Sequence, residues 1–295
     1  MDKPFFSIIL PTYNRADFIV GAINSVIDQR FLYWELIIVD DGSTDNTKQI
    51  VESFTTTDSR IKYFYQNNLE RSLARNKGID ISQCEYLCFL DSDDTYEEDF
   101  LFELSKTIET QNIDIVLSNI KFNGRTSLTN HTNIEKSFTI DYFFSRSTVP
   151  GQCCIRKSFL GDVRFNPKFR ISEDTIFLCD LVSKNPRIYF CPKAFLLYSE
   201  HDSNSVNYKK FNAYKERYEA LNYILTKSYS KKINKEVKRR TLSDCYFGIF
   251  KYHYYQKQVS KARFNIFIAI FLFPKIQLKQ KLYLLLYAHK KNLFT

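Results

Sequence analysis

Two apolar stretches of the chain each end in a cluster of aspartates. Phe89 and Leu90 lead into Asp91, Asp93 and Asp94, which places three carboxylates within four positions. Carboxylates this close repel one another unless a cation lies between them. Hard oxygen ligands suit Mg²⁺ or Mn²⁺, which often bind phosphate oxygens at the same time. The simplest interpretation is a divalent cation that holds a phosphate-bearing substrate.

The same design occurs earlier in the chain. The apolar run of residues 36–39 leads into Asp40 and Asp41, and Gly42 follows. Open α/β sheets bind ligands outside the carboxyl ends of their strands, so we expect both acidic strand ends at one edge of one sheet. Simple capping at the start of a helix is the alternative for these two acids. Two consecutive acids before a glycine favour a nucleotide site.

The elements that would hold these acids alternate between strand and helix, which is typical of a parallel sheet with crossover helices. Predicted strands cover residues 6–10, 35–39, 61–65 and 86–90. Predicted helices cover residues 16–29, a segment that opens near Asp45, and residues 73–81. Less regular elements follow, namely helices at 99–110 and 173–182 and strands at 113–119, 188–191 and 195–198. The pattern predicts an α/β fold.

Several motifs accompany this pattern in a fixed order. They are Pro11-Thr12-Tyr13-Asn14-Arg15, Val39-Asp40-Asp41-Gly42-Ser43-Thr44-Asp45, Ala74-Arg75-Asn76-Lys77-Gly78, Asp91-Ser92-Asp93-Asp94 and Glu173-Asp174. Together they resemble the family 2 glycosyltransferases over about residues 5–206. Members of that family are inverting enzymes that use nucleotide-sugar donors. The resemblance implies a GT-A fold, which is a Rossmann-like, mostly parallel sheet flanked by helices.

The resemblance implies a nucleotide site at the first two motifs. Asp41 would accept a hydrogen bond from the base, and Pro11 and Tyr13 would line the face of its ring. Uracil suits this arrangement, because it offers one ring N–H to a fixed carboxylate and a flat face for aromatic stacking. A UDP-sugar is accordingly the expected donor. Arg75 and Asn76 are expected beside the nucleotide or its diphosphate, although an arginine on a solvated helix face is equally common.

The Asp91-x-Asp93 pair resembles the metal motif of the family. Asp91 would face the ribose or a metal-bound water, and Asp93 would bind Mn²⁺ or Mg²⁺, which neutralises charge on the departing nucleoside diphosphate. Asp94 either shares that task or caps the following helix, and capping is the favoured role. His201 lies where many relatives place a histidine that reaches the metal or the diphosphate. Ser199 stands where related chains often carry a basic residue.

Glu173-Asp174 resembles the acidic motif on the acceptor side of the family. The resemblance implies that Asp174 is the general base, which takes a proton from an acceptor hydroxyl as that oxygen attacks the anomeric carbon. One base and one leaving-group metal imply inversion rather than a retaining nucleophile. Glu173 would orient Asp174 or contact the acceptor. Without the resemblance, an acidic first helical turn would be the preferred explanation.

Charge divides the chain near residue 207. From there onward, 20 lysines and arginines stand against 4 acids, although the net charge of the whole chain is only +9. This division predicts a catalytic domain over residues 1–206 and a basic, aromatic-rich helical extension over residues 207–295. Apolar runs at residues 266–273 and 282–288, surrounded by lysines, favour contact with an anionic membrane surface. A pair of core or dimer helices is the alternative.

Location and redox state follow from what the chain lacks. No stretch reaches the roughly 20 apolar residues of a spanning helix, and the first residues lack the pattern of a secretory signal. The 7 cysteines form no C-x-x-C pair, which favours reduced structural thiols. We expect a cytoplasmic protein that is peripheral at the inner face of the cell membrane.

The expected activity is transfer of a sugar to a hydroxyl of a glycan or lipid-linked acceptor in cell-surface polysaccharide synthesis, with no nucleic-acid partner. A nucleotidyltransferase or another metal-dependent nucleotide-binding enzyme is one alternative, although the chain has neither G-x-G-x-x-G nor G-x-x-x-x-G-K. An adaptor that binds membrane or nucleic acid through the basic extension is another. The sequence leaves the donor sugar, the linkage and the oligomeric state open.

Overall fold

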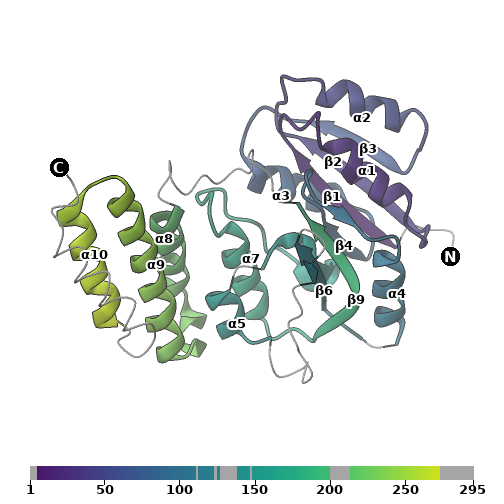
Figure 1. The fold of residues 1–295 in the computed structure, drawn as a ribbon. Helices are drawn as coiled ribbons and strands as arrows, with labels where there is room; N and C mark the ends of the chain where they lie inside the picture. Colours follow the sequence, from purple (N-terminus) through teal and green to yellow (C-terminus); the bar gives the residue numbers. More distant parts are fainter. Residues whose placement is uncertain are drawn as a thin grey trace. The chain divides into compact units, whose positions relative to one another are not determined.

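The computed structural model describes residues 5–110, 112–122, 125–126, 138–146, 148–199 and 213–272 (Figure 1). The chain forms two compact units. One unit holds the sheet and the helices that cover it, and the other unit is helical. The units are discontinuous in sequence, and the functional division at residue 207 stays a prediction.

The described residues of the first unit form a nine-stranded sheet. Its strands are β1 (Phe6–Thr12), β2 (Trp34–Asp40), β3 (Ile61–Tyr65), β4 (Tyr86–Phe89), β5 (Thr95–Tyr96), β6 (Ile115–Phe122), β7 (Arg125–Thr126), β8 (Cys153–Arg156) and β9 (Ile188–Tyr198). Their order is β3-β2-β1-β4-β8-β6-β9-β5, with β7 beside β6. Strands β1 to β4 are mutually parallel, as are β6 and β9, whereas β5, β7 and β8 run antiparallel to their neighbours. The predicted α/β fold with a mostly parallel sheet is confirmed.

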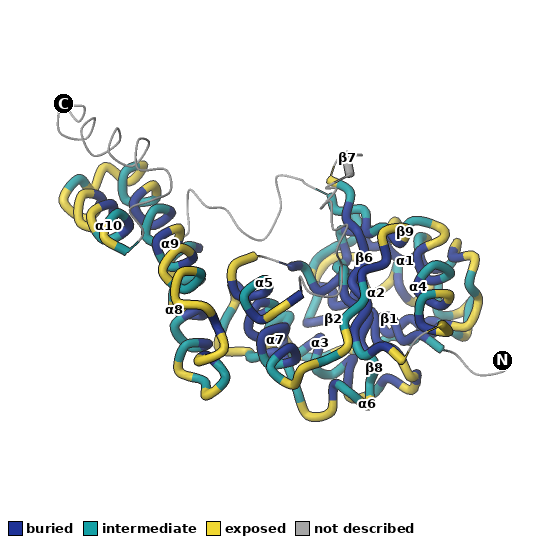
Figure 2. Tube along the Cα trace, turned by 90° about the horizontal axis from the view of Figure 1, so that it is seen from below, coloured by how far each residue is buried: buried dark blue, intermediate teal, exposed yellow. Residues whose placement is uncertain are grey.

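Helices cover both faces of this sheet (Figure 1). They are α1 (Ile19–Ile27), α2 (Thr47–Thr55), α3 (Arg71–Ile81), α4 (Phe100–Glu109), α6 (Lys157–Leu160) and the 3₁₀ turn η1 (Pro150–Gln152). Ile8 and Leu36 join a core with residues of α1 and α4. Ile37 and Val39 point to the other face and pack against Ala74 of α3. Both faces are covered, so β1 and β2 are apolar along nearly their whole length and buried (Figure 2).

Strand order reverses beside β1. The chain runs from β1 through β2 to β3 and then returns to place β4 on the other side of β1. Parallel crossovers are right-handed, so the helix of the return connection, α3, covers the face opposite to α1. Ligands of open α/β sheets bind where the strand order reverses, outside the carboxyl ends of the strands. That point lies between the end of β1 and the end of β4.

The predicted elements agree with the structure in type, and the helix at residues 173–182 is α7 (Glu173–Val182). The strands expected at 188–191 and 195–198 are one strand, β9, whose pairing with β6 shifts register between Ser118 and Asn119. Pro192 lies in that irregular stretch, where its missing N–H interrupts no ladder. Several short elements were not predicted, namely strands β5, β7 and β8 and the helices at Ile140–Ser145 and Lys157–Leu160. All seven cysteines are buried and none forms a disulfide, as expected for structural thiols.

The second unit is helical. Its remaining elements are α5 (Ile140–Ser145), α8 (Ala213–Thr226), the 3₁₀ turn η2 (Ser228–Lys232), α9 (Lys235–Tyr255) and α10 (Val259–Leu272). Asn234 caps α9 by accepting the N–H of Glu236 at 2.7 Å. Gly248 lets α9 approach the ring of Tyr214 in α8, because an added Cβ would lie 2.1 Å from Cγ of that ring. No helix in the described ranges is long and apolar enough to cross a bilayer.

Substitution of Gly78 tests how closely α3 packs on the sheet. A Cβ at Gly78 would lie 2.4 Å from Cγ2 of Ile9 in β1, so Gly78→Ala must push helix and strand apart. We expect the free energy of unfolding to fall by about 1–3 kcal/mol, as in overpacked cores. Urea unfolding measures the loss. Gly21→Ala in α1 is the control, since its Cβ would meet Thr95 at an ordinary 3.9 Å; equal stability of the two variants would contradict the prediction.

Candidate active site

The loops after β1 and β2 are tied together at the edge where the strand order reverses. The N–H of Asn14 donates to the hydroxyl of Ser43 at 2.9 Å, and the side-chain oxygen of Asn14 accepts the N–H of Thr44 at 2.8 Å. Pro11, the penultimate residue of β1, lies beyond the last residue paired with β4, so its missing N–H interrupts no ladder bond there. The side chain of Tyr13 is 45% exposed and therefore accessible to a ligand.

Asp40 has a structural role, because both of its carboxylate oxygens accept hydrogen bonds within the protein. Its side chain is fully buried; one oxygen accepts the N–H of Ser43 at 2.8 Å and the other accepts the hydroxyl of Tyr63 at 2.7 Å. Burial and the neighbouring carboxylate raise the pKa of Tyr63 well above its ordinary value. Of the two aspartates after β2, Asp40 therefore fixes the turn and the end of β3.

Asp41 is held differently. Its Oδ1 accepts two hydrogen bonds, from Nε2 of Gln66 at 2.7 Å and from the N–H of Leu69 at 2.8 Å. Its own N–H donates to the carbonyl of Thr12 at 2.8 Å. Within the described part of the chain, no hydrogen bond engages Oδ2. The carboxylate is thus fixed through one oxygen, and the other oxygen remains available to accept a hydrogen bond.

Unusual backbone conformations accompany the predicted site residues. Positive φ angles occur at Asn14 (51°), Gly42 (89°), Glu70 (81°) and Ser172 (63°). A Cβ at Gly42 would also lie 2.9 Å from the backbone nitrogen of Asn68. Strained conformations of this kind persist where the surrounding structure enforces them, often at functional sites. Asn14 and Gly42 lie inside motifs that the sequence singled out, Ser172 directly precedes Glu173, and Glu70 lies four positions before Ala74.

Arginines balance the acids that follow β4. Nη2 of Arg75 lies 2.6 Å from Oδ1 of Asp91, and Nη2 of Arg15 lies 3.6 Å from Oδ2 of Asp93. Burial opposes ionisation of Asp91, but Arg75, Arg71 and Arg15 outweigh it and hold the pKa of Asp91 below its ordinary value. Asp91 is therefore ionised at neutral pH.

Asp94 does not cap the following helix, which corrects the sequence-based expectation. Its Oδ1 accepts the N–H of Ser199 at 3.1 Å, and Asp99 occupies the N-cap position of α4. Burial and the negative charges of Asp91 and Asp93 raise the pKa of Asp94 to about 8. The edge after β4 therefore holds an ionised carboxylate, Asp91, close to a buried one, Asp94, whose charged form is disfavoured.

The motif on α3 acts through Phe165. The side-chain amide of Asn76 donates to the carbonyl of Phe165 and accepts its N–H, both at 2.8 Å. The Phe165 ring lies 5.3 Å from the guanidinium carbon of Arg75 and packs edge-on against Phe89. Asn76 thus anchors the ring beside the arginine that pairs with Asp91. Contact of Arg75 or Asn76 with a nucleotide stays a prediction.

Asp91 and Asp93 fit a hard divalent cation in chemistry. Both offer carboxylate oxygens, which are the ligands that hard divalent cations prefer. Among the described residues, no three His, Cys, Asp or Glu side chains gather into a complete ligand set. Mg²⁺ and Mn²⁺ suit such a site, because they commonly take the remaining oxygens from water and substrate phosphate. His201 lies outside the described residues.

Glu173 and Asp174 begin α7 directly after the strained Ser172. Glu173 is buried and Asp174 is half-buried. Oδ1 of Asp174 accepts the N–H of Thr175 at 2.6 Å. Both acids belong to the second unit, so their roles toward the sheet edge stay predictions.

Sequence reasoning missed the residues that hold the predicted site residues and their neighbours in place. These are Tyr63, Gln66, Leu69 and Phe165. The sequence did contain a signal for Gln66. It directly follows the predicted strand at 61–65, and Asp41 lies two residues after the predicted strand at 35–39, so both are expected near the same sheet edge. Nothing local marked Phe165, which meets Asn76 from 89 residues away.

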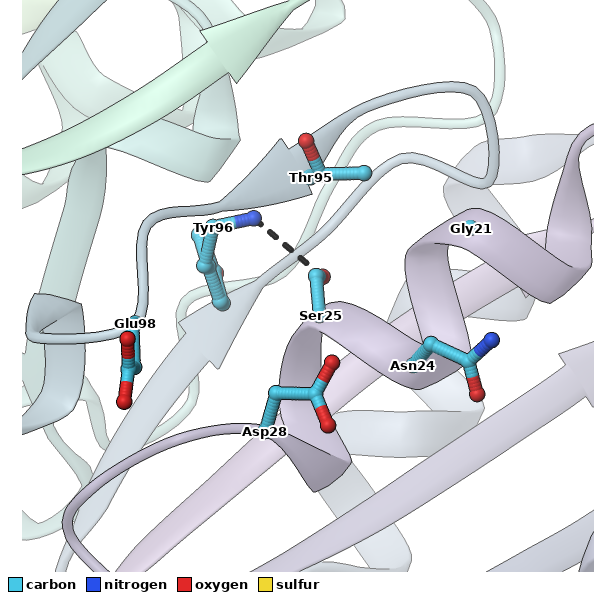
Figure 3. A pocket seen from close by; sticks show the side chains of 7 residues that line it. All are labelled: Gly21, Asn24, Ser25, Asp28, Thr95, Tyr96 and Glu98. Atoms are coloured by element: carbon cyan, nitrogen blue, oxygen red, sulfur yellow. Dashed lines mark hydrogen bonds between the residues drawn. The ribbon is translucent and has the colours of Figure 1, made fainter.

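A separate pocket of about 550 Å³ opens between α1 and β5 (Figure 3). None of the predicted site residues lines it. The Ser25 hydroxyl accepts the N–H of Tyr96 there, and Asp28 and Glu98 contribute acids. The predicted site is thus the sheet edge, not this pocket.

The comparisons with known proteins agree on one family. Residues 7–161 match the family described as glycosyl transferase family 2. A putative teichuronic acid biosynthesis glycosyltransferase, TuaG of Bacillus subtilis, is 43% identical over 108 residues, which is 36% of this chain and 42% of that protein. Glycosyltransferase GlyG of Streptococcus pneumoniae is 32% identical over 187 residues, 58% of this chain and 57% of that protein. The chain thus spans less than two thirds of either relative.

A third relative is matched over a greater length. The GalNAc(5)-diNAcBac-PP-undecaprenol beta-1,3-glucosyltransferase of Campylobacter jejuni is 30% identical over 211 residues, 69% of this chain and 67% of that protein. Among solved structures, S. aureus TarS 1-349 in complex with UDP-GlcNAc matches with a TM-score of 0.67 and 22% identity. That match covers 97% of this chain and 87% of the TarS chain. At this identity, it supports the GT-A fold alone.

Proposed function

The chain belongs to glycosyl transferase family 2, and from this we propose that it transfers a sugar from a UDP-sugar to an acceptor hydroxyl, with inversion at the anomeric carbon. One observation carries the proposal. Asp41 is fixed through Oδ1 at the same sheet edge where the carboxylates of Asp91 and Asp93 follow β4. A base-reading carboxylate and a cation-binding pair at one edge match the two ends of a nucleoside diphosphate.

For the nucleotide, we assign Asp41 to the uracil N–H and the exposed ring of Tyr13, with Pro11, to the face of the base. Arg75 and Asn76 act from α3, where they keep Asp91 and Phe165 in place. The complexes of TarS with UDP-GlcNAc and with UDP support a uridine nucleotide for this chain as well.

For the metal, we assign Mn²⁺ or Mg²⁺ to Asp91 and Asp93, with His201 as a further candidate ligand. When bound, such a cation would stabilise the charge of the departing diphosphate. The residues of the chain contribute the remaining steps. Asp174 takes the proton of the acceptor hydroxyl, and Glu173 orients that carboxylate or contacts the acceptor. Attack on the face opposite the diphosphate gives inversion.

For the acceptor, we propose a glycan or a lipid-linked glycan in cell-surface polysaccharide synthesis at the cytoplasmic face of the membrane. The names of the relatives from Bacillus subtilis and Campylobacter jejuni support this class. In this proposal, residues 1–206 bind the donor and catalyse transfer, and the basic residues 207–295 meet the acceptor or an anionic membrane surface.

Donor binding should depend on the metal and on Asp93. We expect calorimetry to detect UDP binding that strengthens with Mn²⁺. Asp93→Asn should weaken the Mn²⁺-dependent part by more than the roughly 10- to 100-fold that changes behind metal ligands cost. Asp162→Asn, at an exposed position, is the matched control and should bind as the wild type does. If the folded protein binds no UDP with or without the metal, the proposal fails.

The general base is tested separately. Asp174→Asn removes the proton acceptor but keeps the size of the side chain, so UDP binding should persist while transfer falls by about 10²-fold or more. A panel of nucleotide sugars first identifies the donor, and product formation is then measured at saturating donor. Asp162→Asn again serves as the control. Undiminished transfer by Asp174→Asn would place the base at another residue.

A further inference from the structure

Helix α10 presents an aromatic face to solvent. Phe264, Phe267 and Phe271 follow one another at spacings of three and four residues, which places them on one side of the helix. Their exposed fractions are 65%, 64% and 74%. Single exposed apolar residues are ordinary in soluble proteins, but a contiguous aromatic stripe usually marks an interaction surface.

The opposite side of α10 fixes this orientation. Ala262, Ile266 and Ala269 are buried, and Ile266 packs in a cluster with Phe250 of α9. The hydroxyl of Ser243 in α9 also donates to the carbonyl of Ala269 at 2.7 Å. The helix therefore buries Ala262, Ile266 and Ala269 and leaves its phenylalanines exposed. Figure 2 shows buried and exposed residues alternating along α10.

The surroundings of the aromatic face are basic. Lys261 and Arg263 lie exposed on the same helix, and Lys251 and Lys257 lie exposed on α9 and in the turn before α10. No aspartate or glutamate occurs between residues 245 and 272. Phenylalanines flanked by cations are the pattern of helices that lie in the headgroup region of a membrane.

We propose that the face formed by Phe264, Phe267 and Phe271 inserts into an anionic membrane surface, with Lys261 and Arg263 against the lipid phosphates. The proposed function already includes contact of residues 207–295 with an anionic membrane surface. This inference rests on that proposal and names the residues that make the contact. A second copy of the chain is the less favourable occupant. A twofold contact through this face would bring two basic surfaces together, whereas anionic lipid neutralises them.

Co-sedimentation of the full chain with vesicles tests this surface. The vesicles contain either phosphatidylcholine alone or an equal mixture of phosphatidylcholine and phosphatidylglycerol. We expect binding to the anionic vesicles that weakens as salt is added. The triple variant Phe264→Ser, Phe267→Ser and Phe271→Ser should bind at least about tenfold more weakly, because it loses the buried apolar area. The control Leu32→Ser with Tyr33→Ser removes exposed apolar residues of the first unit and should bind normally.

A charge variant, Lys261→Gln with Arg263→Gln, should lower both the affinity and its salt dependence. Equal binding by the wild type and the triple serine variant would overturn the inference, as would a wild type that ignores anionic vesicles. So would a wild-type dimer that the triple variant converts to monomer without any vesicle binding. UDP binding is measured on the same samples. A chain that binds UDP but no vesicles loses this inference and keeps the proposed function.

A second, independent observation concerns Gln66. Its Nε2 and the N–H of Leu69 both donate to Oδ1 of Asp41, and its own N–H donates to the carbonyl of Asp40 at 2.9 Å. Gln66 is thus held by the backbone of β2 while it holds the side chain of Asp41. The side chain of Asp41 is 4% exposed, so its orientation depends on these two donors.

We infer that Gln66 is a positioning residue that aims Oδ2 of Asp41 at the donor base and so sets its selectivity. This rests on the proposed function. Oδ2 can accept the ring N–H of uracil, but it meets only a lone pair at the same ring position of cytosine. A buried carboxylate left facing an acceptor loses its hydrogen bond, which costs more than a poor fit of shape.

Calorimetry with UDP and CDP in the presence of Mn²⁺ tests this role. Gln66→Leu should weaken UDP binding about tenfold, the value of one hydrogen bond to a charged group, and should lower the ratio of UDP to CDP affinity. A purely structural role would leave that ratio unchanged. Gln66→His keeps an N–H donor and should restore part of it. The matched control is Gln83→Leu, at an exposed position before β4.

An unchanged ratio in Gln66→Leu would overturn the inference even if affinity fell. If the wild type binds UDP and Gln66→Leu binds both nucleotides as the wild type does, only this inference fails. If the wild type binds neither nucleotide, the proposed function fails and the inference fails with it.

Discussion

Parallel pairing of β1 with both β2 and β4 is the constraint on which the first unit depends. It aligns the carboxyl ends of three strands, so the residues that follow them, Tyr13, Asp41 and Asp91, lie along one edge. The pairing is stable because both faces of these strands are covered; neighbouring residues such as Leu36 and Ile37 pack against helices on opposite sides. Side chains at the edge therefore start from a rigid frame, which is what a site for a charged ligand requires.

The acids at this edge are tolerated because each is handled by a different interaction. Asp40 is saturated by the backbone of Ser43 and the hydroxyl of Tyr63. A buried arginine balances the charge of Asp91, and burial together with the neighbouring carboxylates raises the pKa of Asp94. The negative charges that would repel one another at this edge are thus offset by arginines, by hydrogen bonds or by a raised pKa. The motif on α3 serves this balance, because Asn76 anchors the ring that packs beside the arginine.

Much of this arrangement was predictable from local patterns. The strand and helix alternation, the α/β class and the acidic strand ends follow from apolar periodicity and from motif order, which are short-range properties of the chain. The errors have physical causes. Strand β8 is only four residues long and carries no alternation. Asp94 was expected to cap a helix, but the backbone of Ser199, 105 residues away, supplies its hydrogen bond.

The sequence by itself determined which residues reach the sheet edge, because the end of each strand is set by the point where apolar residues give way to acids and glycine. Only the tertiary structure decided what each acid does there. Asp40 and Asp41 are adjacent and chemically identical, yet both oxygens of Asp40 accept hydrogen bonds within the fold, whereas among the described residues only Oδ1 of Asp41 does. That difference comes from Tyr63 and Gln66, which lie 23 and 25 residues along the chain and meet the two carboxylates only after β3 pairs with β2.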